Sequence, residues 1–352
     1  MKDHCNPKCC LCGNDGEVLF RDLRDNLWNV PGKWNMIRCT SPACGLLWID
    51  PMPNPAEISK LYSSYYTHSQ DNASRGLAFN LFECVRKAVL ASRFGYTEIA
   101  RSGFWRFAGR ALAYLPTLTD RVGRTVMWLS AADRGQLLDL GCGDGRLLAR
   151  MKDAGWEVVG LEPDHKAAEI AAGKYNFQIH EGSLEEAAFD EAVFDAITMA
   201  HVLEHLPDPL ATLKESLRIL RPGGRLAIVT PNSASLGLRR YGPDWRGLEP
   251  PRHLHLFGPA AIRHAAERAG FAVKLIKSVS CCGASVWLNS DYLRAKRTGV
   301  WQDPKDCGFI TRQSRKLAHR LRRLLYTVWQ TVMYWIDPNS PEEILLLAEK
   351  PR

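Results

Sequence analysis

Three glycines, Gly141, Gly143 and Gly145, follow directly on an apolar run and precede an amphipathic stretch. Glycine lets a backbone turn sharply and approach a ligand where a Cβ atom would clash. The next apolar run ends in Glu162. A carboxylate at the tip of a second strand can accept hydrogen bonds from both hydroxyls of a ribose. This order of strand, glycine turn, helix and acid-tipped strand predicts a nucleotide-binding site.

Cysteines with metal-ligand spacing form a second group near the N-terminus. One pair has two residues between its members, the other pair has four, and each pair is followed by a glycine. The four residues are Cys9, Cys12, Cys39 and Cys44. Two such knuckles can bring four thiolates around zinc and leave no open coordination position, so we expect a structural zinc ion. Cys5 and Cys10 are alternative ligands, and reduced thiols or disulfides are the alternatives to a metal.

The glycine turn differs from a dinucleotide-binding loop, because its third glycine comes one position early. The segment 139–145 resembles the first motif of the class I S-adenosylmethionine-dependent methyltransferases. Segments 194–200, 220–228 and 252–257 are similar to later motifs of the subgroup related to ubiquinone-biosynthesis and other small-molecule methyltransferases. The resemblance spans about residues 133–280 and the last strand, and it implies an α/β fold with a Rossmann-like, seven-stranded sheet.

The resemblance also implies a cofactor site for S-adenosylmethionine. Asp139 and the three glycines would surround the methionine part, and Glu162 would hold the ribose. The other contacts that it implies are Ser183 and Leu184 at the adenine, and Met199, Ala200 and His201 beside the sulfonium. Ser183 stands where the family commonly has an acidic residue, so the adenine contact is left open.

Methyl transfer from a sulfonium is an in-line displacement, in which the protein aligns the acceptor and sometimes removes a proton. The candidate bases are His201, Glu204, His205, His253 and His255. His253 and His201 are the expected catalytic residues, and a brace for its own loop is the alternative role of His253. His201 and His205 share a face if their segment is helical, and His253 and His255 share one if theirs is extended.

Positive charge is concentrated in two segments. Residues 76–130 contain eight Lys and Arg against three acidic residues, and residues 292–335 contain ten against two. The whole chain has a net charge of +8, so the rest of it is acidic overall. In both segments basic residues alternate with apolar and aromatic ones, as in a helix that lies on an anionic membrane surface. A lid over an anionic substrate, or solvated arginines on packed helices, are the other interpretations.

Five segments follow from these patterns. We expect a zinc-ribbon-like module at 1–50, a helical cap at 51–132, the cofactor-binding core at 133–280, a basic helical insertion at 281–341 and the last core strand at 342–352. Some sugar and small-molecule methyltransferases resemble this arrangement, with a zinc ribbon before the catalytic domain. The alternation of strand and helix signals in the core predicts a parallel sheet with crossover helices.

The expected function is methyl transfer to a hydroxyl or activated carbon of a small-molecule, sugar or lipid-linked acceptor, which could be anionic. An RNA methyltransferase is a second interpretation, because a zinc ribbon and basic helices also suit RNA; the absence of a recognisable stacking module argues against nucleic acid. A non-catalytic, membrane-associated binding protein with a vestigial cofactor site is a third. With 46% apolar and 24% charged residues and no long apolar run, we expect a cytoplasmic globular protein, or one peripheral to the inner face of the membrane.

Overall fold

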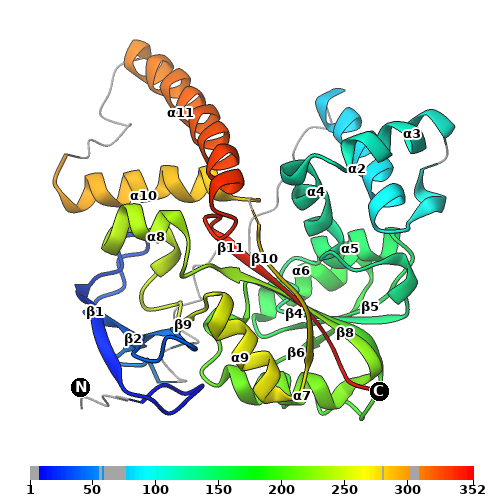
Figure 1. The fold of residues 1–352 in the computed structure, drawn as a ribbon, viewed down its shortest axis with the longest axis horizontal. Coiled ribbons are helices and arrows are strands. Elements are labelled where there is room, and N and C mark those ends of the chain that lie inside the picture. The colour runs from blue at the N-terminus through cyan, green and yellow to red at the C-terminus, as the bar shows by residue number, and fades with distance from the viewer. Residues whose placement is uncertain (1–7, 55–57, 59–76, 101, 280, 301–308) are drawn as a thin grey trace. The chain divides into compact units, whose positions relative to one another are not determined.

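The computed structural model describes residues 8–54, 58, 77–100, 102–279, 281–300 and 309–352 (Figure 1). The described residues form two compact units, and neither is a continuous stretch of chain. We call them the cysteine unit and the sheet unit. The cysteine unit takes its residues from Met1–Ile58, Thr230–His264 and Lys277–Ile344, and the sheet unit from Ser59–Val229, Ala265–Ile276 and Leu345–Arg352.

A seven-stranded sheet carries the fold. Its strands are β4 (Gln136–Leu140), β5 (Glu157–Glu162), β6 (Gln178–Glu181), β7 (Phe194–Ala200), β8 (Leu220–Pro231), β10 (Ala272–Val279) and β11 (Glu343–Glu349). Their order in the sheet is β10-β11-β8-β7-β4-β5-β6. The strands β6, β5, β4, β7 and β8, in this order, pair in parallel with one another. Hydrogen bonds from Gly223 N to Lys350 O and from Asn232 N to Glu342 O show that β11 is antiparallel to β8.

Helices connect and precede these strands. They are α2 (Leu77–Arg93), α3 (Gly103–Leu112), α4 (Pro116–Gly123), α5 (Arg146–Asp153), α6 (His165–Tyr175), α7 (Pro209–Ile219) and α9 (Pro259–Ala269). Two of the crossover helices begin at an aspartate whose side chain caps the first turn: Asp164 accepts from Ala167 N, and Asp208 accepts from Ala211 N. Such caps satisfy backbone N–H groups that have no partner within the helix.

The cysteine unit contains a small antiparallel sheet with the order β1-β2-β3-β9. Its strands are β1 (Gly16–Leu23), β2 (Trp34–Cys39), β3 (Leu47–Asp50) and β9 (His255–Leu256), and its helices are α8 (Leu236–Tyr241), α10 (Gly283–Arg297) and α11 (Phe309–Ile336). The register pairs Trp48 of β3 with His255 of β9. A strand from the N-terminal fifth of the chain is therefore paired with a strand that lies about 200 positions later in the sequence.

A buried carboxylate accepts hydrogen bonds from two separate segments of the cysteine unit. Glu342 accepts a hydrogen bond from the indole N–H of Trp245 at 2.7 Å and another from that of Trp287 at 2.7 Å. Both tryptophans belong to the core, together with Met36 and Leu47 of the small sheet. Burial raises the pKa of Glu342 to about 7 despite these donors.

The structure confirms the α/β class and the seven-stranded sheet expected from the sequence, including a last strand at Glu343–Glu349. The segment boundaries stay predictions, and parts of the segments 1–50, 51–132 and 281–341 lie outside the described residues, Cys5 among them. No helix in the described ranges combines the length and the apolar character needed to cross a membrane.

Candidate cofactor site and cysteine cluster

The register of the sheet brings the ends of three strands to one edge. Leu140 of β4 lies beside Leu161 of β5 and beside Met199 of β7. The residues that follow, the glycine turn, Glu162 and Ala200, therefore lie at the same carboxyl edge. In an open parallel sheet this edge is where ligands bind.

The glycine turn has a backbone that other residues rarely adopt. Gly141, Gly143 and Gly145 have φ angles of 66°, 53° and 78°. A Cβ atom at Gly141 would lie 2.6 Å from Cγ2 of Val202, in the segment that follows β7. Glycine is therefore required at this position by both the backbone conformation and the close approach of a neighbouring loop.

Glu162 links the end of β5 to this turn. Its Oε2 accepts a hydrogen bond from Gly143 N at 2.8 Å, and its Oε1 accepts one from Asp164 N at 3.0 Å. Burial raises the pKa of Glu162, while the two backbone N–H donors act in the opposite direction. A carboxylate held in this way keeps lone pairs for the hydroxyls of a ribose, because each oxygen accepts more than one hydrogen bond.

Asp139 lies beneath the turn and is fully buried. Its Oδ1 accepts a hydrogen bond of 2.6 Å from the hydroxyl of Thr198 on the neighbouring strand. Burial raises the pKa of Asp139 to about 7; the bond from Thr198 lowers it, and the charge of Glu162 raises it further. The carboxyl edge thus holds two acidic groups that a cationic ligand would stabilise in the ionised form.

The expected adenine contacts follow β6. Leu184 is buried and Ser183 is exposed. Ser183 N donates to Oε2 of Glu186 at 2.7 Å, and Glu186 N donates to Ser183 Oγ at 3.2 Å. A carboxylate therefore lies at this position although Ser183 replaces the acidic residue common in the family, and it comes from three residues further along the chain.

The residues expected beside the sulfonium end β7. Met199 is fully buried, and His201 has a φ of 58° with its side chain about one-third exposed. Its Nδ1 lies 3.1 Å from Oε1 of Glu204, which is buried. The helical turn here spans only Leu203–His205, so His201 and His205 do not share a helix face.

His253 and His255 are both buried but contact different groups. Nδ1 of His253 lies 2.7 Å from the carbonyl oxygen of Gly247 and therefore donates to it, and Nε2 lies 3.5 Å from Oε2 of Glu249. Nε2 of His255 lies 3.7 Å from Sγ of Cys10. Of the two residues, only His255 belongs to a strand. His253 and His255 therefore do not lie on one extended strand that would place both rings on the same face.

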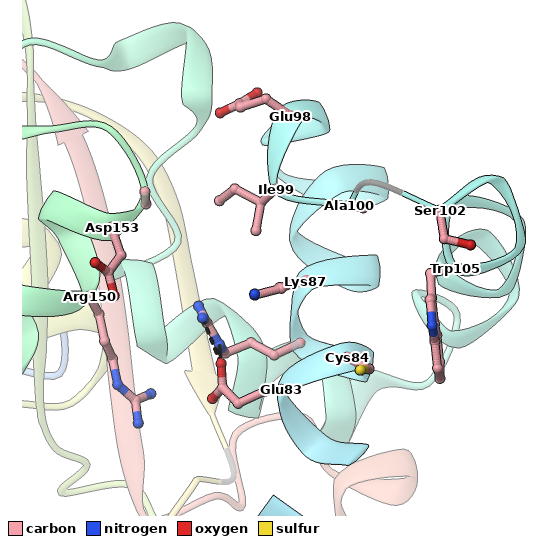
Figure 2. A pocket seen from close by; sticks show the side chains of 12 residues that line it. Glu83, Cys84, Lys87, Glu98, Ile99, Ala100, Ser102, Trp105, Arg150 and Asp153 are labelled. Carbon is pink, nitrogen blue, oxygen red and sulfur yellow. Dashed lines mark hydrogen bonds and ion pairs between the residues drawn. The ribbon is translucent and has the colours of Figure 1, made fainter. Parts of the chain in front are cut away.

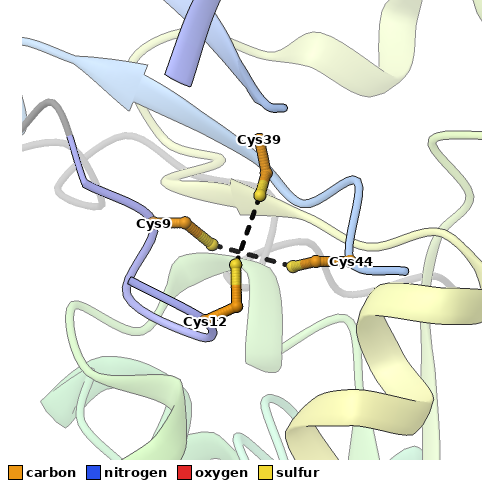
Figure 3. A group of neighbouring side chains, drawn as sticks. All are labelled: Cys9, Cys12, Cys39 and Cys44. Carbon is orange, nitrogen blue, oxygen red and sulfur yellow. Dashed lines mark hydrogen bonds between the residues drawn. The ribbon is translucent and has the colours of Figure 1, made fainter. Parts of the chain in front are cut away.

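The four expected cysteines come together in the cysteine unit (Figure 3). Their sulfur atoms all lie within 4.8 Å of one another, with 3.7 Å between Cys9 and Cys44 and 3.3 Å between Cys12 and Cys39. A tetrahedral zinc with bonds of about 2.3 Å needs sulfur atoms about 3.8 Å apart, so the four residues fit this ion. The contact with Cys44 lowers the pKa of Cys9 to about 5 and raises that of Cys44.

A separate hollow of about 740 Å³ lies in the sheet unit, between α2, the residues 98–100 and 102–105, and the C-terminal part of α5 (Figure 2). Its charged lining residues are Arg86, Lys87, Arg150, Glu83, Glu98 and Asp153. Because both signs are equally represented, the lining has no net positive charge. The hollow lies at the opposite end of α5 from the glycine turn, so it is distinct from the carboxyl edge of the sheet.

Sequence reasoning did not find Thr198, Val202 or Glu186. Thr198 and Val202 reach their partners, Asp139 and Gly141, only through the pairing of β7 with β4. Glu186 had a local signal, because Ser followed three residues later by Glu is the pattern of a reciprocal side-chain and backbone cap.

The strand order and the glycine turn with its acid-tipped second strand are those of the class I S-adenosylmethionine-dependent methyltransferase fold. A family model described as a methyltransferase domain matches residues 104–275. The chain is 33% identical over 193 residues to an uncharacterized methyltransferase of Mycolicibacterium paratuberculosis, covering 54% of this chain and 71% of that protein. The chain belongs to this methyltransferase family.

The chain is also similar to a curated relative over a shorter stretch and to a solved structure at low sequence identity. The chain is 36% identical over 103 residues to the ubiquinone biosynthesis O-methyltransferase of Aromatoleum aromaticum, covering 28% of this chain and 44% of that protein. A solved S-adenosylmethionine-dependent methyltransferase from Archaeoglobus fulgidus is 18% identical, with a TM-score of 0.44 over 71% of this chain and 100% of that one. The chain spans about half the length of the first curated relatives that it matches.

Proposed function

We propose that the protein transfers the methyl group of S-adenosylmethionine to a hydroxyl or activated carbon of a small-molecule, sugar or lipid-linked acceptor. The observation that carries this proposal is the hydrogen bond from Gly143 N to Glu162, because it joins the carboxylate proposed to bind the ribose to the glycine turn at the carboxyl edge of the sheet. The ubiquinone-related name of one relative supports a small-molecule acceptor.

In the proposed cofactor site, Asp139 and the three glycines surround the methionine part and Glu162 holds the ribose. Ser183 and Leu184 face the adenine, with the Glu186 carboxylate as an acceptor for its amino group. Met199, Ala200 and His201 flank the sulfonium. When bound, the cofactor supplies a methyl group already activated for displacement, so alignment and exclusion of water are the main tasks of these residues.

His253 is the proposed proton acceptor when the acceptor group is a hydroxyl. Its Nδ1 is occupied by the Gly247 carbonyl, so a neutral ring has its lone pair on Nε2. The nearby Glu249 carboxylate would stabilise the imidazolium that forms when Nε2 takes a proton. His201, held by Glu204 at the end of β7, is the second candidate.

The four-cysteine cluster is proposed to hold a structural zinc ion. Cys39 ends β2, and Cys44 lies just before β3, the strand that pairs with β9. The metal would therefore stabilise the small sheet that includes His255 in β9, with His253 two residues before that strand. Four thiolates leave no coordination position for a substrate, so no catalytic step is assigned to the zinc.

The proposed function is tested by measuring S-adenosylhomocysteine release from the full chain with separate panels of phenols, sugar derivatives, lipid-linked compounds and RNA. Turnover with one of the first three panels, reduced in Glu162→Ala when the cofactor is limiting, is the expected result. Turnover with RNA alone, lost steeply as salt rises, would contradict the proposed acceptor class. Failure to bind the cofactor at all would contradict the enzyme itself.

A further inference from the structure

The long helix α11 exposes an apolar face that is unusual for a surface helix. Eight large apolar side chains on it are about half exposed or more, between 47% for Val332 and 70% for Trp335. They are Leu321, Leu324, Leu325, Val328, Trp329, Val332, Trp335 and Ile336. At 100° per residue they fall within an arc of about 140°, and they extend along about 22 Å of the helix.

The opposite side of α11 is the one that packs in the cysteine unit. Tyr326 contacts Trp287 of α10 ring to ring at 5.2 Å, and its hydroxyl donates to Asp291 at 2.6 Å. Gln330 is buried and approaches Gly283 at the start of α10. In Figure 1 the N-terminal half of α11 projects beyond this contact with α10. The apolar face is therefore not needed for the packing of α11 on α10.

The charges of α11 indicate what covers this face. The helix has 28 residues without a single Asp or Glu. Arg320 and Arg322 are exposed on either side of the apolar arc, and neither has a carboxylate partner among the residues that the structure describes. An apolar face with tryptophans and flanking arginines is the pattern of a helix that lies in the interface of an anionic bilayer.

We propose that this face of α11 docks on an anionic lipid surface, with the helix axis in the plane of the interface. A second copy of the chain is a poorer partner, because pairing two such helices would bring their arginines together with no carboxylate in either helix. The proposal is independent of the proposed acceptor, since it rests on α11 alone. A docked α11 would keep the enzyme at the surface where an anionic or lipid-linked compound is found.

The test is co-sedimentation of the full chain with phosphatidylcholine vesicles that contain or lack about one-third phosphatidylglycerol, at low and high salt. We expect binding to the anionic vesicles only, weakened by salt. Arg320→Gln combined with Arg322→Gln should lower the partition coefficient about 25-fold at low salt, since each arginine near an anionic surface contributes roughly fivefold. Val328→Asp should lower it by roughly tenfold or more.

Phe107→Asp is the matched control, because Phe107 is 74% exposed on α3 of the sheet unit. It should bind vesicles as the wild type does, and all variants should keep the wild-type cofactor affinity. Absence of binding by the wild type, or loss of binding in Phe107→Asp but not in Val328→Asp, would overturn the proposal. The proposal would also be overturned if the wild type were a dimer that does not bind vesicles and Val328→Asp were a monomer. That result would assign the face to a second copy of the chain.

Discussion

The carboxylate of Glu162 and the backbone N–H of Gly143 are 2.8 Å apart, and this hydrogen bond couples the end of β5 to the turn that follows β4. The two residues are therefore held in their relative positions before any ligand arrives. A preorganised site of this kind loses less conformational entropy on binding. The Glu162 carboxylate can still accept hydrogen bonds from a ribose, because this contact uses only one of its lone pairs.

Replacing Cys12 by serine should remove a bound metal from the cysteine unit. The full chain, purified without chelator, is expected to contain about one zinc per chain, and Cys12→Ser to contain almost none, because three thiolates and a hydroxyl bind zinc poorly. The measurement is elemental analysis of the dialysed protein. Cofactor affinity should be little changed, since the glycine turn and Glu162 belong to the sheet unit.

Cys84→Ser is the control for the metal analysis, because Cys84 lies on α2 and belongs to no cysteine cluster within the described ranges. This variant should keep the full zinc content. Metal-free wild-type protein, or equal zinc in Cys12→Ser and Cys84→Ser, would rule out the four-cysteine site.

Replacing His253 by alanine should slow turnover by roughly 10²–10⁴-fold, the usual contribution of a general base. Cofactor affinity should stay within about twofold of the wild type, because the variant removes a group assigned to the acceptor. The measurements are kcat with a saturating acceptor and calorimetric affinity for the cofactor. His319→Ala, an exposed histidine on α11, is the control. A kcat within a few-fold of the wild type would make the bracing of its own loop the better account of His253.

Asp25→Asn should destabilise the cysteine unit and impair the His253 loop. Asp25 and Arg252 form an ion pair at 3.1 Å with side chains only 2% and 1% exposed, and Asp25 also accepts backbone hydrogen bonds from Leu27 and Trp28. Removing one member of a buried pair costs about 3–5 kcal/mol of unfolding free energy. Denaturant unfolding measures this loss, and kcat should fall while cofactor affinity does not.

Asp22→Asn provides the matched comparison, because Asp22 pairs with Lys33 at 3.2 Å on the surface, with its side chain 70% exposed. Such a pair contributes about 0–1 kcal/mol. If both variants lost the same stability, the Asp25–Arg252 pair would have no special role in holding the loop.

Local patterns in the sequence were sufficient to predict the central sheet. The glycine turn, the acid at the end of the second strand and the final strand each have signals within about ten residues, and their order restricts the topology to few choices. The four cysteines were found for the same reason, since a metal site repeats a short spacing that can be recognised without knowing what packs around it.

Contacts between distant segments could not be predicted in this way. The pairing of Trp48 with His255 and the buried pair of Asp25 with Arg252 join residues more than 200 positions apart. Glu342 lies one residue before β11, and nothing in its spacing indicates that two tryptophan N–H groups converge on it. The described residues of the predicted N-terminal module share one compact unit with residues from 230–264 and 277–344, and no local pattern in the sequence predicts that association.

The most direct test of the account is calorimetric titration of S-adenosylmethionine into the wild type, Glu162→Ala and Glu157→Ala. Glu157 is the control, because it is exposed at the opposite end of the same strand. The account predicts that Glu162→Ala binds the cofactor about 1.5–3 kcal/mol more weakly, the usual contribution of a hydrogen bond to a charged group, while Glu157→Ala binds it as the wild type does. Undiminished affinity in Glu162→Ala, or equal losses in both variants, would contradict the cofactor site described for this methyltransferase.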